Sequence, residues 1–94
     1  MAIHRKNNMD YLLSHHPEKE MKRRGIPLAI LESVLAAPQQ KTPGNGAILC
    51  RQSQVHIGGK MYLVRVMVNE TVFPPVVVTV YRTSRIAKYW EVET

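Results

Sequence analysis

Only one cysteine, Cys50, occurs in the 94 residues, so no disulfide can form within the chain. Small secreted domains usually depend on several disulfides, and their absence favours a reducing compartment such as the cytoplasm. No apolar run, of which 76–80 is an example, approaches the roughly 20 residues that a membrane-spanning helix requires. The first residues also lack the apolar segment of a secretory signal peptide. We therefore expect a cytoplasmic protein that does not engage a membrane.

Motifs of the commonest catalytic and cofactor chemistry are missing as well. There is no Walker phosphate-binding loop, no GxGxxG, no GxSxG and no HExxH. The histidines at 4, 15, 16 and 56 do not combine with Cys50 at the ligand spacing of a zinc site. We predict that the protein holds no metal and needs no cofactor. Cys50 shares its parity with Ile48 in a predicted strand, so we expect a buried apolar side chain and not a nucleophile.

What the composition does contain is a basic balance. Thirteen Lys and Arg residues against seven Asp and Glu residues give a formal net charge of +6. A positive field attracts polyanions, so nucleic acid and an acidic protein are both candidate partners, although solubility alone would also explain the charge. Hydrophobic residues make up 45% of the chain, as in ordinary folded proteins. We expect a flexible leader at 1–9 and a single domain at 10–94.

The segment after the leader predicts a short strand and a first helix. Residues 10–13 form a short apolar segment, which we interpret as a strand. Ser14 or His16 can cap the helix, acidic residues near its start and basic residues near its end complement the helix dipole, and Gly25 stops it. Met21 is its one interior apolar side chain. Because most of this helix must then face solvent or a partner, we interpret it as the functional helix.

A second helix and a three-stranded meander follow. The helix opens at Pro27 and ends at Pro38, and four apolar residues share one face: Leu28, Leu31, Val34 and Leu35. A turn-rich loop at 39–46 precedes strands predicted at 47–53, 60–69 and 76–83, and a closing helix at 84–93 brings together Ile86, Tyr89 and Trp90. This order predicts an α+β fold in which two N-terminal helices pack on a curved antiparallel sheet of three to four strands, with a short C-terminal helix.

Alternation along the strands assigns the two faces of the sheet. Most even-numbered residues of the last two strands are apolar and are predicted to form the core: Tyr62, Val64, Val66, Val68, Val76, Val78 and Val80. Arg65, Thr79 and Tyr81 then share the open face, joined by Arg51 if its strand keeps the same parity. A β-bulge would break the alignment. Such a group could bind phosphate, because guanidinium pairs with anionic oxygens; the alternative is a solvated outer face.

Two histidines, His15 and His16, stand at the start of the first helix. The positive end of a helix attracts anions, and histidine exchanges protons near neutral pH. An acid–base group could therefore act there beside a phosphate. The alternative is that the pair only caps the helix or lies on the surface.

Four segments carry a resemblance to a known family. A histidine precedes a helix ending in RRGI, and PLAILESVLAAP, GGKMYLVRVMV and VVVTVYRTSRIAKYW follow in that order. Together they cover about residues 10–90 and resemble a widespread uncharacterised bacterial family placed beside the BrnT and RelE-like ribonuclease toxins. The resemblance implies a helical pair on a curved antiparallel sheet. It also implies a metal-independent ribonuclease or a component of a toxin–antitoxin system.

The resemblance also suggests site residues. His16 matches the family's histidine and Arg24 its later arginine, while the last-strand motif covers three residues: Thr79, Tyr81 and Arg82. The family commonly has arginine where this chain has Glu20. A carboxylate at that position would weaken the attraction for phosphate.

Two main functional hypotheses remain open. In the first, the protein is an RNA endonuclease in which His16 acts as acid or base and Tyr81 positions or stacks a base. Arg24 and Arg65 would stabilise the charge that develops on the phosphate. Further RNA contacts would come from Arg23, Arg51, Thr79, Arg82 and Lys88. In the second, favoured by Glu20, the fold is a non-catalytic basic module that binds nucleic acid or an acidic antitoxin-like protein. Self-association through an exposed sheet edge is a third possibility.

Overall fold

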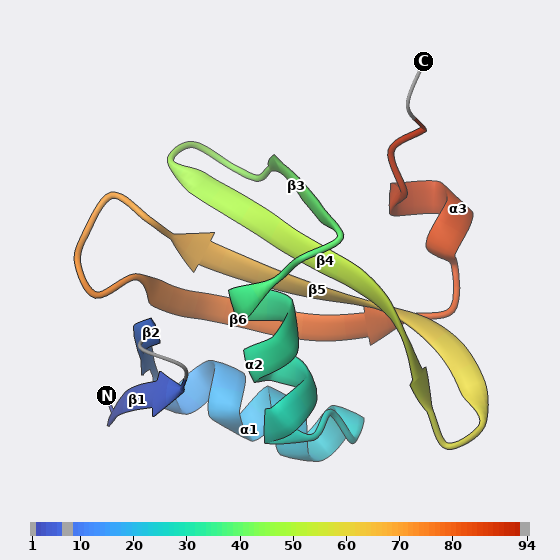
Figure 1. The fold of residues 1–94 in the computed structure, drawn as a ribbon, viewed down its shortest axis with the longest axis horizontal. Helices are drawn as coiled ribbons and strands as arrows, with labels where there is room; N and C mark the ends of the chain where they lie inside the picture. Colours follow the sequence, from blue (N-terminus) through green and yellow to red (C-terminus); the bar gives the residue numbers. More distant parts are fainter. Residues whose placement is uncertain (1, 7–8, 93–94) are drawn as a thin grey trace.

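Two helices cover one face of a six-stranded sheet in the computed structural model, which describes residues 2–6 and 9–92 and the side chains of 11–92 (Figure 1). The helices are α1 (His15–Arg24), α2 (Leu28–Ala36) and α3 (Ile86–Tyr89). The strands are β1 (Ala2–Lys6), β2 (Met9–Leu13), β3 (Gln40–Pro43), β4 (Ile48–Ile57), β5 (Lys60–Asn69) and β6 (Val76–Thr83). The predicted α+β class, its two N-terminal helices and its short C-terminal helix are confirmed. No helix within the described ranges is long and apolar enough to cross a membrane.

The sheet is larger than the sequence predicts. Its order is β1-β2-β6-β5-β4-β3, and neighbouring strands are antiparallel except for the parallel pair β2 and β6. Residues 2–6 form β1 and Met9 begins β2, although a flexible leader was expected at 1–9. Residues 1, 7 and 8 of that leader are outside the described residues. β3 lies in the predicted loop 39–46. Both additions are edge strands, which backbone pairing creates without a strong apolar period.

The helices begin and end close to the predicted residues. Gly25 ends α1 with φ 64°, a left-handed conformation that glycine adopts at little cost. Met21 on α1 and three residues of α2 enter the core: Leu31, Val34 and Leu35. Leu28, the first of the four apolar residues of α2, stays 43% exposed and lines an open groove beside Ile26. It lies in the first turn of α2.

A β-bulge in β6 determines which side chains reach the core. Along β5, Val64, Val66 and Val68 are fully buried, as predicted, whereas Tyr62 is half-buried. Opposite them, Met67 pairs with Thr79 but Val68 pairs with Val77, so Val78 is an extra residue. Val77 and Val80 therefore face the core. The prediction for Val76 and Val78 is wrong, since the first pairs with Asn69 on the other face and the second is 38% exposed.

One end of β4 extends past its neighbour β3. Pairing with β3 stops at Gln52, so residues 53–57 form a free edge within the described sheet. Gln39 occupies the start of this edge. Its side-chain oxygen accepts a hydrogen bond from the Gln54 N–H at 2.9 Å, and its side-chain nitrogen lies 3.5 Å from the Gln54 carbonyl oxygen. The carboxamide of Gln39 thus takes the place of a peptide group of a neighbouring strand.

Candidate anion-binding site

Four polar side chains form a row across the face of the sheet opposite α1 and α2. The strand register pairs Gln40 with Gln52, Gln52 with Arg65, and Arg65 with Tyr81. Residues paired across antiparallel strands point to the same side of the sheet. Since Val66 faces the helices, its neighbour Arg65 and the other three must face away from them. We call these four residues the polar row.

Hydrogen bonds connect the polar row from β3 to β6. The Gln52 side-chain nitrogen donates to the Gln40 side-chain oxygen at 2.8 Å, and Arg65 Nε donates to the Gln52 side-chain oxygen at 2.9 Å. Arg65 Nη1 donates to the Tyr81 hydroxyl. Burial raises the pKa of Tyr81 and outweighs the opposing effect of Arg65, so the hydroxyl stays protonated at neutral pH. The row therefore fixes the position of the Arg65 guanidinium.

Arg65 has no carboxylate partner among the described residues. Its guanidinium carbon lies 4.3 Å from the centroid of the Tyr89 ring and 5.7 Å from that of Tyr81, a cation–π arrangement that leaves the charge uncompensated. The hydrogen bonds to Gln52 and Tyr81 use only part of its five N–H groups. A half-buried, oriented guanidinium with free donors is suited to an anionic oxygen.

An open pocket of about 500 Å³ lies beside Arg65. Thr79, Met67 and Val78 form its floor on the sheet, and the loop at 43–48 forms its wall. Gly44 allows this loop to turn back tightly, because a β-carbon there would lie 2.8 Å from the Ile48 carbonyl oxygen. The pocket thus combines one cation, polar groups and apolar surface.

The C-terminal segment lies over the polar row and is held by backbone contacts. The Gln40 side chain donates to the Glu91 carbonyl oxygen at 2.6 Å and accepts from the Glu91 N–H at 3.1 Å, and Gln52 donates to the Tyr89 carbonyl oxygen at 3.2 Å. The helix predicted at 84–93 is consequently a single turn, and Trp90, which follows it, is extended. Tyr89, which was predicted to lie beside Ile86 and Trp90, instead packs against Tyr81, with ring centroids 6.3 Å apart.

Replacing Gln40 by alanine should loosen the C-terminal segment without unfolding the protein. Two hydrogen bonds to Glu91 would be lost, and neutral hydrogen bonds each contribute about 0.5–1.5 kcal/mol. Hydrogen exchange of the Glu91 amide should accelerate about tenfold while core amides are unchanged. Gln54→Ala is the control, because that side chain makes no hydrogen bond to the segment in the described structure. Equal exchange in the two variants would contradict the role of Gln40.

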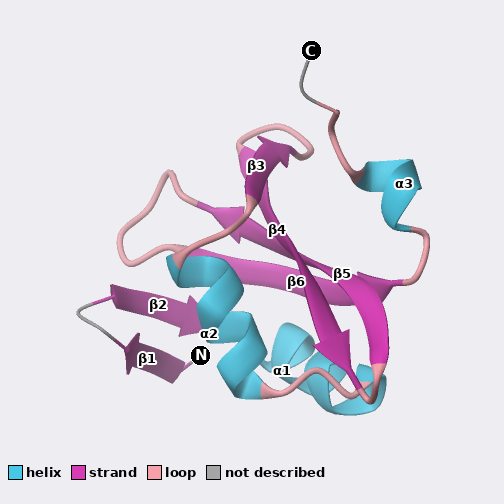
Figure 2. Ribbon diagram, turned by 45° about the vertical axis from the view of Figure 1, so that its right-hand side comes forward, coloured by secondary structure: helices cyan, strands magenta, loops and turns pink. Residues whose placement is uncertain are grey.

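The four predicted catalytic residues fall into two groups on opposite sides of the sheet. Arg65 and Tyr81 belong to the polar row, whereas His16 and Arg24 lie on α1, which packs on the other face (Figure 2). His16 is exposed, as is the adjacent His15. The prediction that the first helix adjoins Arg65 is therefore wrong. It rested on the resemblance, since no sequence spacing connects the helix with that face.

Glu20 neutralises the basic end of α1. Its carboxylate accepts hydrogen bonds from Arg24 at 2.8 Å and from Arg23 at 3.0 Å. These contacts, first that of Arg24, lower the pKa of Glu20, so the carboxylate stays ionised at neutral pH. Both arginines already have a partner, which reduces their value for binding phosphate.

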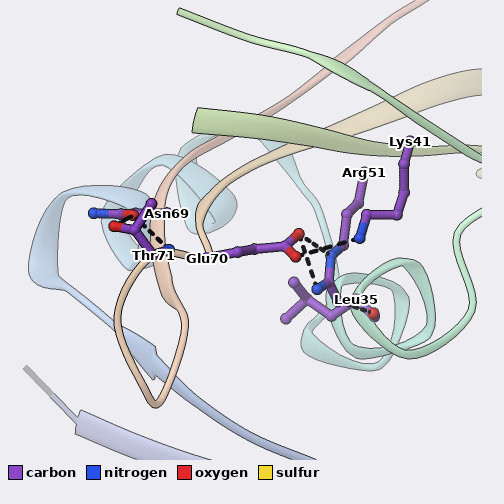
Figure 3. Close-up of polar contacts among 6 residues, drawn as sticks. All are labelled: Leu35, Lys41, Arg51, Asn69, Glu70 and Thr71. Atoms are coloured by element: carbon purple, nitrogen blue, oxygen red, sulfur yellow. Dashed lines mark hydrogen bonds and ion pairs between the residues drawn. The ribbon is translucent and has the colours of Figure 1, made fainter. Parts of the chain in front are cut away.

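Arg51 is on the helix side of the sheet, so its predicted place beside Arg65 is wrong. Arg51 pairs with Val66 of β5, and its guanidinium donates a hydrogen bond to the Leu35 carbonyl oxygen. Its Nε and Nη2 atoms each lie 3.0 Å from the Glu70 carboxylate, which also contacts Lys41 (Figure 3). Arg51 therefore joins the end of α2 to the loop after β5. The role is structural.

The other predicted contact residues also divide between the faces. Thr79 lines the pocket, and Lys88 Nζ lies 5.2 Å from the Tyr89 ring centroid, so both are on the side of the polar row. Arg82 faces the helices, with its guanidinium carbon 4.4 Å from the Tyr62 ring centroid. Cys50 is fully buried, as predicted, but it lies on the side of the polar row because it pairs with Met67. Burial raises its pKa and keeps the thiol protonated.

Sequence reasoning missed Gln40, Gln52 and the role of Tyr89. The position of Gln52 could have been predicted from the two-residue Gly58-Gly59 turn. Such a turn pairs Ile57 with Lys60, so every even-numbered residue of β4 lies opposite an odd-numbered residue of β5. That rule sets Gln52 opposite Arg65. No comparable signal exists for the contacts of the C-terminal segment.

Comparisons with known proteins do not add a family. No family model, curated protein or solved structure matches the chain. Within residues 2–6 and 9–92, no group of three or more His, Cys, Asp or Glu residues is arranged to hold a metal ion. A function must therefore be inferred from the geometry of the site.

Proposed function

We propose that the protein is a non-catalytic binding module that recognises phosphate groups of RNA through Arg65 and the adjoining pocket. The observation that carries this proposal is the oriented guanidinium without a carboxylate partner among the described residues. The net charge of +6 adds a long-range attraction for polyanions. The resemblance to ribonuclease toxins favours RNA over DNA. The free, buried thiol of Cys50 is compatible with a reducing, cytoplasmic environment.

Binding is better supported than cleavage because no acid–base partner of Arg65 is found among the described side chains. Attack by a ribose hydroxyl needs a group that exchanges a proton close to the phosphate. His16 is on the opposite face of the sheet, and the protonated Tyr81 hydroxyl is a hydrogen-bond partner and not a base at neutral pH. An acidic protein could also approach Arg65, so the experiment must compare both ligands.

Fluorescence anisotropy with a labelled single-stranded RNA, in EDTA and over a series of salt concentrations, tests the proposal. We expect binding whose affinity falls steeply as salt rises, because each phosphate contact releases counterions. An acidic peptide of equal charge should compete weakly. Absence of RNA binding by folded protein at low salt would refute the proposal. Cleavage to 2′,3′-cyclic ends that is lost in His16→Ala would replace it by the endonuclease hypothesis.

A further inference from the structure

The pocket beside Arg65 combines a charged end with apolar surface. Arg65 supplies the cation, and Thr79 supplies a hydroxyl. Ile48, Met67 and Val78 contribute apolar surface on the same pocket. An inorganic anion would use only the charged end. A ligand that uses the whole pocket must be amphipathic, with an anionic group joined to an apolar or aromatic part.

The bulge in β6 adds Val78 to the apolar surface of the pocket. In a regular strand Val78 would face away from the pocket, as its alternation with Thr79 requires. The extra residue between the pairs Met67–Thr79 and Val68–Val77 turns Val78 outward, where it is 38% exposed. β-Bulges commonly redirect side chains next to binding sites.

The size and shape of the pocket favour one nucleotide over a duplex. Its volume of about 500 Å³ is within the range of roughly 300–1,000 Å³ for small-ligand pockets. The loop at 43–48 lines the pocket together with the sheet, so a base must leave its stack to reach the apolar surface between them. Bases in single strands can do so, whereas paired bases in an A-form duplex cannot.

We propose that this pocket receives one nucleotide of a single strand, with its phosphate at Arg65 and its base against Met67 and Val78. The inference rests on the proposed function, because it assumes that Arg65 binds RNA phosphate. It adds that the base contributes to affinity, which charge alone does not require. Thr79 also lines the pocket and can donate its hydroxyl to the sugar or phosphate.

Two RNA probes and one pair of variants test the inference. The probes are a single-stranded oligomer and the same oligomer without its bases, and the variants are Val78→Ser and Val72→Ser. Val72 is a matched control, because it is 47% exposed but lies outside the pocket. We expect Val78→Ser to weaken binding of the intact oligomer about threefold to tenfold and to leave the abasic oligomer unaffected, since only the apolar contact is lost. Val72→Ser should change neither affinity.

The outcomes separate this inference from the proposed function. If the intact and abasic oligomers bind equally, or if the two valine variants behave alike, the nucleotide pocket is refuted while RNA binding stands. If a duplex of the same sequence binds as tightly as the single strand, the pocket is likewise refuted. If wild-type protein binds no RNA, the proposed function itself fails. Circular dichroism checks that both variants, which change exposed side chains, remain folded.

Discussion

Arg65→Gln should weaken RNA binding about tenfold to hundredfold and leave the protein folded. Hydrogen bonds to charged groups contribute about 1.5–3 kcal/mol, and about 1.4 kcal/mol corresponds to a factor of ten in affinity. Glutamine keeps a polar group near Gln52 and Tyr81 but carries no charge. The RNA affinity of Arg65→Lys should lie between those of Arg65→Gln and the wild type, because lysine keeps the charge and loses the planar arrangement of donors. Anisotropy titrations at one fixed salt concentration measure both.

The control for Arg65 is Arg23→Gln, which removes the same charge from the helix side of the sheet. Arg23 already contacts Glu20, so its loss should change affinity only through the long-range field. If Arg23→Gln weakens binding as much as Arg65→Gln, binding follows net charge and has no defined site.

Glu70→Gln should lower the free energy of unfolding by about 2 kcal/mol, the largest stability effect that we expect outside the apolar core. Glu70 and Arg51 have side chains only 22% and 16% exposed, so the substitution leaves the guanidinium charge in a partly desolvated place without a carboxylate, where only neutral oxygens such as the Leu35 carbonyl accept its hydrogen bonds. For a domain of this size the melting temperature should fall by about 10 °C. Thermal unfolding at neutral pH measures the change.

The same variant should flatten the acid limb of the stability curve. Burial acts to raise the pKa of Glu70, but hydrogen bonds from Arg51 and Lys41 outweigh it, and the pKa is lowered from the usual 4.5. Its stabilisation is therefore present above pH 4.5 and lost as the pH falls through the lower folded-state pKa. Glu20→Gln is the control at neutral pH and should destabilise much less, since Glu20 contacts arginines exposed to solvent. Equal losses would contradict the role of burial.

Local chemistry made most of the secondary structure predictable. Gly25 and Pro27 separate the two helices by rules that act within a few residues, and β5 and β6 have the predicted boundaries, 60–69 and 76–83. The strands at the two edges were missed or uncertain because their pairing is supplied by other parts of the chain. Bulges are equally non-local, so nothing in the valine run 76–78 indicates which residue is extra.

The candidate site was predictable only where alternation continues unbroken. Arg65, Thr79 and Tyr81 share a face as predicted, because the bulge precedes Thr79 and leaves the later alternation intact. Arg51 was assigned to the wrong face, because odd-numbered residues of β4 lie opposite even-numbered residues of β5. His16 and Arg24 were joined to the site by resemblance alone, and the side of the sheet on which a helix packs cannot be obtained from the helix's own sequence.

The Gln39 carboxamide bears on how the protein behaves when it is concentrated. Unpaired strand edges recruit strands from other molecules, which is a common origin of aggregation. The Gln39 side chain contacts both the N–H and the carbonyl oxygen of Gln54. An incoming strand would therefore have to displace Gln39 before pairing could extend along 53–57. A single side chain thus acts as a steric and hydrogen-bonding block against polymerisation, at an edge that the fold itself leaves open.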